Sequence, residues 1–213
     1  TKLAAQAIRS GWTKQQLVKL ASSSIITSDY YLIMDSDNLF VRNTSLSDLI
    51  DAQGKAVTDM YFVRSGDLTS IDWLTASAKA LQLPVASYTS LLVDNSVISV
   101  TPQILSVDIA RSLIDRLAYL SGEKGWIAYL NERSSNTTRF WTEYMLYHSH
   151  AVSTGMFHTY HAPGRTKQGS IWAKTRVTPS LLDSIFNETV SHKQGFMALI
   201  QSNRWSTWNE TSE

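Results

Sequence analysis

The feature that most constrains this chain is an apolar run that stops abruptly at two aspartates. Residues 31–34 read YLIM, without the alternation expected of a strand with one wet face, so they predict a strand covered on both faces in a parallel sheet. Asp35, Ser36 and Asp37 follow at once. Ligands of open α/β sheets collect at the carboxyl ends of the strands. The two carboxylates therefore lie where such folds carry out their chemistry.

Helices and strands are expected to alternate along the rest of the chain. Helical spacing predicts helices over residues 13–22, 70–83, 101–122 and 178–190, the third with a Thr-Pro start and a glycine stop, and the strongly aromatic residues 139–152 read as a helix or a turn. Apolar or alternating runs predict strands over residues 59–66, 85–100, 156–160 and 195–202, and residues 161–172 read as a polar loop. This order predicts one α/β domain over residues 1–213 with a mostly parallel sheet.

The composition argues against several classes of protein. There are 19 Lys and Arg against 18 Asp and Glu, and no run of like charge, so we expect no nucleic-acid partner. No apolar stretch reaches the ~18 residues of a membrane span, and we expect neither a span nor a signal peptide. Because cysteine is absent, disulfides and thiolate metal sites are excluded, but cytoplasm and secretory lumen both stay open.

Two aspartates at positions i and i+2 can face one point when the backbone turns between them. Hard carboxylate oxygens of this kind suit Mg²⁺ or Mn²⁺, especially an ion that also holds a diphosphate. The competing interpretation is that Asp35 caps a turn and Asp37 is simply solvated, because a D-x-D pattern is common by chance.

The neighbouring motifs resemble those of one enzyme family. "DYYLIMDSDNLFV" is similar to the D-x-D strand of A-type glycosyltransferases. Together with "GWTKQQLVKL", "VTPQIL" and "TEYMLY", it resembles a poorly characterised glycosyltransferase family with the pattern GWxxQQxxKL…YLxxDxD…EYxLY, related to the capsid-glycosylating domain of large algal viruses. The resemblance implies a Rossmann-like nucleotide-diphospho-sugar transferase fold, with a mostly parallel central sheet flanked by helices and a metal-held sugar nucleotide.

A fourth motif, "HAPGRTKQGSIW", is similar to the H-x-x-G-x-x-K-P-W loop of glycogenin-like transferases, although its proline is not matched. This resemblance implies that His161 completes the metal shell begun by Asp35 and Asp37. It also implies that Gly164 and Lys167 hold the diphosphate. A lysine there would neutralise charge that develops on the leaving group.

The other motifs and their neighbouring residues supply the remaining site candidates. Gln16, Lys19, Ser36 and Asn95 are the further donor-binding candidates. Glu143 is the candidate base for the acceptor hydroxyl, because its aromatic neighbours favour a protonated carboxyl group and offer a stacking platform for sugar rings. The competing interpretations are a solvated helix surface for Gln16 and Lys19 and an ordinary helix glutamate for Glu143, with His148 and His150 as alternative bases.

These observations predict a divalent-metal-dependent glycosyltransferase of the hexosyltransferase class. It would move a sugar from a UDP- or GDP-sugar to a hydroxyl of a glycan or glycoprotein, and the candidate base favours inversion. One alternative is a metal-dependent phosphohydrolase, which predicts more acidic residues near Asp35 than the sequence has. Another is a non-catalytic carbohydrate- or nucleotide-binding module of the same fold. The usual first strand of the family is not found before Gly11, and its true absence, as opposed to a truncation of this sequence, would favour the module.

Overall fold

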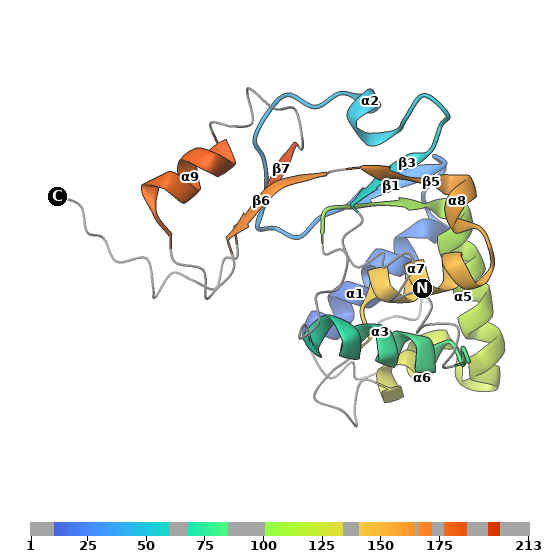
Figure 1. The fold of residues 1–213 in the computed structure, drawn as a ribbon. Coiled ribbons are helices and arrows are strands. Elements are labelled where there is room, and N and C mark those ends of the chain that lie inside the picture. The colour runs from blue at the N-terminus through green and yellow to red at the C-terminus, as the bar shows by residue number, and fades with distance from the viewer. Residues whose placement is uncertain are drawn as a thin grey trace. The chain divides into compact units, whose positions relative to one another are not determined.

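The computed structural model describes residues 11–59, 68–84, 101–133, 141–164, 166–171, 177–186 and 196–200. The protein is α/β, with more helix than strand and with small sheets that include a parallel pair (Figure 1). Two compact units are formed from interleaved stretches of the chain. The first consists of Thr1–Tyr31, Met60–Val100 and Leu105–His161, and the second of Leu32–Asp59, Thr101–Ile104 and Ala162–Glu213.

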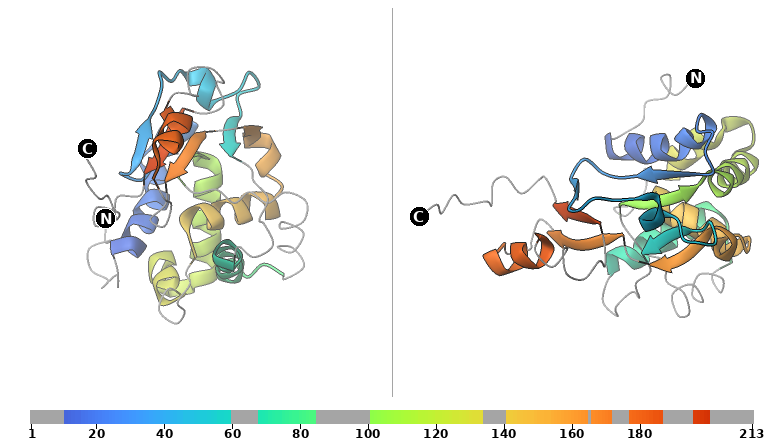
Figure 2. Two further views of the ribbon diagram at one scale, coloured as in Figure 1. Left: turned by 60° about the vertical axis from the view of Figure 1, so that its left-hand side comes forward. Right: turned by 90° about the horizontal axis from the view of Figure 1, so that it is seen from above.

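Helices dominate the first unit. They are α1 (Gly11–Ala21), α3 (Leu68–Ala80), α5 (Val107–Ser121), α6 (Trp126–Arg133), α7 (Glu143–Ser153) and α8 (Phe157–Tyr160), with short 3-10 helices η2 (Ser22–Ser24) and η3 (Gly122–Lys124). Helix α7 contacts α1, α3 and α5 (Figure 2). All of its side chains from Glu143 to Ala151 are buried, as expected of a helix enclosed on every side. Polar groups at these positions therefore need partners inside the protein.

A side-chain cap defines the start of α7. Thr142 has an extended backbone, and its hydroxyl accepts a hydrogen bond from the Met145 backbone N–H at 3.2 Å. This satisfies one of the amide groups that every helix leaves unpaired at its first turn. The cap fixes Glu143 as the first residue of the helix.

The second unit contains a three-stranded sheet in the order β2 (Asn38–Phe40), β7 (Met197–Ile200) and β6 (Lys167–Ile171). Strands β2 and β7 are antiparallel, whereas β6 and β7 are parallel. Helix α9 (Pro179–Phe186) packs on β6 through Leu181 and Leu182, which meet Ile171 and Ala198. The four-residue helix α2 (Leu46–Leu49) begins with a capping box.

The other strands form two pairs. One pair is β1 (Tyr30–Ile33) with β4 (Gln103–Ser106), and the other is β3 (Ala56–Asp59) with β5 (His161–Gly164). The described strands thus form three small sheets, and the single mostly parallel central sheet of the sequence analysis stays a prediction. Among the described helices, none is long and apolar enough to cross a membrane.

Several elements confirm the sequence pattern. Helices α1, α3, α7 and α9 and strands β1 and β7 lie at or near the predicted ranges. In β1, however, burial alternates, and Met34 lies outside the strand and is exposed. Among the other predicted strands, residues 60–66 and 85–100 lie outside the described residues.

Three predictions of local structure were wrong. The helix expected over residues 101–122 begins only at Val107, because Gln103–Ser106 pairs with β1 and buries all four side chains. Its predicted stop at Gly122 is confirmed, with a positive φ of 55° that glycine tolerates. The strand expected over residues 156–160 is the short helix α8. The loop expected over residues 161–172 contains β5 and β6, because long-range pairing with β3 and β7 outweighs a polar, glycine-containing sequence.

Candidate functional site

The two aspartates follow β1 in a turn, as the sequence predicts, and we call residues 35–38 the D-x-D turn. Asn38 closes it: its backbone N–H and its side-chain Nδ2 both donate to the carbonyl oxygen of Asp35, at 3.1 and 3.2 Å. The Asp37 carbonyl oxygen accepts from the backbone N–H of Ile200 at 2.8 Å. Asp35 and Asp37 are half-buried and Ser36 is exposed. Solvent therefore reaches the turn that carries the two carboxylates.

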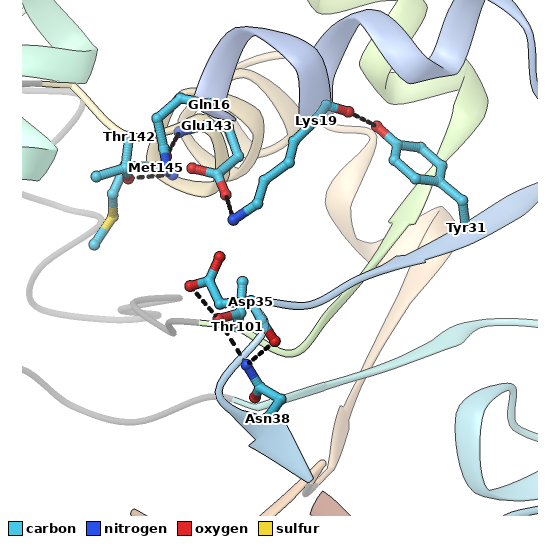
Figure 3. A network of polar contacts seen from close by, with 9 residues as sticks. All are labelled: Gln16, Lys19, Tyr31, Asp35, Asn38, Thr101, Thr142, Glu143 and Met145. Carbon is cyan, nitrogen blue, oxygen red and sulfur yellow. Dashed lines mark hydrogen bonds and ion pairs between the residues drawn. The ribbon is translucent and has the colours of Figure 1, made fainter. Parts of the chain in front are cut away.

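A buried hydroxyl group holds one of these carboxylates. Thr101 Oγ1 donates to Asp35 Oδ2 at 2.8 Å and accepts from Asn38 Nδ2 at 3.3 Å (Figure 3). Thr101 is 1% exposed and Asn38 is 5% exposed. The sequence analysis did not mark either residue as part of the site. The only signal was that both lie within motifs that carry the family resemblance.

The chemistry of the D-x-D turn fits a hard divalent cation. Two half-buried carboxylates on one turn can bind Mg²⁺ or Mn²⁺, with water and phosphate oxygens as the remaining ligands. Among the described residues, no three His, Cys, Asp or Glu side chains gather into a group that could hold a metal. The three-ligand set with His161 therefore stays a prediction.

His161 is the first residue of β5 and is 2% exposed. Its Nε2 atom lies 2.7 Å from the hydroxyl oxygen of Tyr147, and that oxygen accepts the backbone N–H of Ser106, also at 2.7 Å. In the Nδ1–H tautomer of His161, the Tyr147 hydroxyl group donates its proton to Nε2. Metal binding by Nε2 would have to displace this hydrogen bond.

The His161 ring belongs to an aromatic cluster in the first unit. It stacks on Phe157 with ring centroids 5.1 Å apart, and it meets Tyr147 and His148 edge to face. Burial lowers the pKa of His161 from 6.5 to about 4. Burial, followed by the charge of His161, holds the pKa of His148 well below its usual value. Both imidazoles are therefore neutral at pH 7, where they pack as aromatic side chains.

Glu143 forms a buried ion pair with Lys19. Its Oε1 atom accepts from Lys19 Nζ at 2.9 Å, and its backbone N–H donates to Gln16 Oε1 at 3.3 Å (Figure 3). Glu143 is 0% exposed, Lys19 is 9% exposed and Gln16 is 3% exposed. The solvated-surface interpretation of Gln16 and Lys19 is thus wrong, because this face of α1 packs on the start of α7. Gln15, one residue away, is exposed.

The ion pair bears on the role predicted for Glu143. An ammonium group at hydrogen-bond distance stabilises the ionised carboxylate, against the effect expected from aromatic neighbours. Burial, and then the negative charge of Glu143, raises the pKa of Tyr31, whose hydroxyl donates to the Lys19 carbonyl oxygen at 3.4 Å. Glu143 has no solvent-exposed surface through which an acceptor hydroxyl could reach it in this conformation. Its role as a base stays a prediction.

The remaining predicted residues give less information about the site. Gly164 lies in β5, where a Cβ atom would collide with Cγ1 of Val57, so close packing accounts for this glycine. Lys167 begins β6 and pairs in register with Met197. The side chain of Lys167 and all of Asn95 lie outside the described residues. The diphosphate-binding roles of these residues stay predictions.

One family model matches almost the whole chain. Residues 4–211 match DUF6492, which is described as a family of unknown function. The chain belongs to this family. No curated protein and no solved structure matches it.

The DUF6492 match covers the D-x-D turn, the Lys19–Glu143 pair and the His161 cluster alike. The family description assigns none of them a role, so their chemistry has to be argued from the residues. The sequence did not mark Thr101, Asn38 or Tyr147 as site residues. Thr101 and Tyr147 form hydrogen bonds with residues distant in sequence, and Asn38 bonds to Asp35 only because the backbone turns between them.

Proposed function

We propose that this protein is a divalent-metal-dependent glycosyltransferase that moves a sugar from a nucleotide-diphosphate donor to a hydroxyl of a glycan or glycoprotein. The observation that carries the proposal is the D-x-D turn: two half-buried carboxylates directly follow a strand, and a buried hydroxyl group holds one of them. Resemblance of the surrounding motifs to A-type glycosyltransferases supports it. The α/β class and the parallel pair β6 and β7 agree with that fold.

In this proposal Asp35 and Asp37 hold Mn²⁺ or Mg²⁺, and Ser36, which is exposed, lies on the donor side together with Lys167. The bound cation would supply Lewis-acid assistance to the departing diphosphate. The carboxylates contribute the negative charge that keeps the ion in place, and the turn fixes their spacing. The nucleotide is a UDP- or GDP-sugar.

Glu143 can serve as the base only if the residues that bury it move when the acceptor binds, because a general base has to reach the proton that it takes. If Glu143 stays buried against Lys19, both residues are structural. The complete burial of Glu143 therefore favours a second candidate function: a module of the same fold that binds the nucleotide sugar without transferring it.

The first test measures thermal stabilisation by UDP- and GDP-sugars, each with and without Mn²⁺. A ligand at about 100 times its dissociation constant should add ~2.7 kcal/mol to the free energy of unfolding. We expect a Mn²⁺-dependent shift with one class of donor that disappears in Asp35→Asn and Asp37→Asn. Asp29→Asn is the matched control, because Asp29 is exposed and precedes the other end of β1. Its carbonyl oxygen, which accepts from Val107, survives the substitution.

Stabilisation that persists in both D-x-D variants would place the ligand elsewhere and contradict the proposal. The absence of any shift in folded wild-type protein would contradict both the transferase and the binding module. Stabilisation without turnover of the donor would favour the module.

A further inference from the structure

The direction of the hydrogen bonds around Thr101 is fixed by the chemistry of its partners. Nδ2 of Asn38 also contacts the Asp35 carbonyl oxygen, which can only accept, so this atom is the amide nitrogen. The same nitrogen therefore donates to Thr101 Oγ1. The hydroxyl group has one proton, and a carboxylate oxygen lies 2.8 Å away. The proton of Thr101 accordingly points at Asp35 Oδ2.

Burial makes this arrangement rigid. Thr101 and Asn38 are almost completely enclosed, while the carboxylate that they orient is only half-buried. Thr101 lies 66 residues from Asp35 in sequence, in the short stretch Thr101–Ile104 that belongs to the same compact unit. A fixed donor behind a ligating carboxylate is the arrangement that orients metal ligands in proteins.

We propose that Thr101 is a positioning residue of the D-x-D turn, whose hydroxyl group holds Asp35 in the orientation in which its carboxylate binds a divalent cation. This inference rests on the proposed function, since it requires a cation at Asp35 and Asp37. Asn38 completes the arrangement by directing the hydroxyl proton toward the carboxylate. Loss of a group that orients a metal ligand lowers metal affinity by about 10–100-fold.

The test is the dissociation constant for Mn²⁺, measured by electron paramagnetic resonance of the free ion, with Mn²⁺ alone and with Mn²⁺ plus UDP or GDP. Thr101→Val removes the hydroxyl group but keeps the shape of the side chain, and should raise the constant about tenfold or more. Thr101→Ser keeps the hydroxyl group and should stay within about twofold of wild type. Thr58→Val is the matched control, because Thr58 is a threonine of the same unit, is also buried, and donates to the Ala56 carbonyl oxygen instead.

Circular dichroism melting checks that each variant is folded, and Thr101→Ala replaces Thr101→Val if the latter is not. The inference would be overturned, and the proposed function would stand, if the Thr101 variant without a hydroxyl group bound Mn²⁺ as tightly as wild type and Thr58→Val do. Wild-type protein that binds no Mn²⁺ under any of these conditions would overturn both. So would Mn²⁺ affinity that is unchanged in Asp35→Asn and Asp37→Asn.

Discussion

Replacing Lys19 with methionine should strongly destabilise the protein, because it leaves the carboxylate of Glu143 buried without its cation. The two charged atoms are 2.9 Å apart, and the side chains are 10% and 0% exposed. At an effective dielectric constant of 20, two unit charges at this distance attract by about 6 kcal/mol. Desolvation opposes this attraction, and removing one partner of a buried pair typically costs about 3–5 kcal/mol. We expect Lys19→Met to lower the free energy of unfolding by that amount.

The assay is urea unfolding followed by tryptophan fluorescence, arranged as a double-mutant cycle. Glu143→Gln alone should also destabilise, whereas Lys19→Met combined with Glu143→Gln should lose less than the sum of the single changes, with a coupling of about 2–3 kcal/mol. Lys14→Met is the matched control on the same helix, and since Lys14 is exposed, its effect should stay within about 0.5 kcal/mol.

Single variants that each cost less than about 1 kcal/mol, with no coupling, would refute this reasoning. They would show that solvent reaches the pair and that burial does not determine its energy. Glu143 would then be more accessible to an acceptor than the structure indicates.

Three further predictions concern stability and are measured by urea titration. Folding lowers the pKa of His161 from 6.5 to about 4, so the unfolded chain binds the proton first, and this group alone should remove about 3 kcal/mol between pH 6.5 and 4, in addition to the losses from the buried His148 and His150. His161→Gln should lack this loss; parallel pH profiles of the two proteins would contradict it. Tyr147→Phe leaves the Ser106 N–H without its acceptor and should lower the free energy of unfolding by about 1–3 kcal/mol. An unchanged urea midpoint would contradict this prediction. Gly164→Ala places a methyl group against Val57 and should also cost about 1–3 kcal/mol, most of which should return when Val57→Ala is added.

The local sequence pattern was sufficient to predict those elements that depend on residues close together in sequence. The apolar run before Asp35 predicted β1 and the placement of both aspartates after it, and helical spacing predicted α1 and α9. A glycine stop predicted the end of α5 at Gly122. Such signals act within a few residues, so one sequence is enough to find them.

Partners that are distant in sequence could not be predicted in the same way. Lys19 and Glu143 are 124 residues apart, and the periodicity of α1 alone does not tell a buried ion pair from a solvated lysine. The strand β4 was mistaken for helix because its short apolar run fits both structures until β1 provides a pairing partner. Thr101 was missed for the same reason, since only the fold brings its hydroxyl group to Asp35.

The measurement that tests the central claim most directly is the release of nucleoside diphosphate from UDP- and GDP-sugars in the presence of Mn²⁺, followed by mass spectrometry with and without glycan acceptors. We predict Mn²⁺-dependent release from one class of donor, slow with water as the acceptor and faster with a suitable glycan. Release should be lost in Asp37→Asn and retained in Asp29→Asn. No release from any donor by folded protein, or release of inorganic phosphate instead of intact nucleoside diphosphate, would contradict a glycosyltransferase.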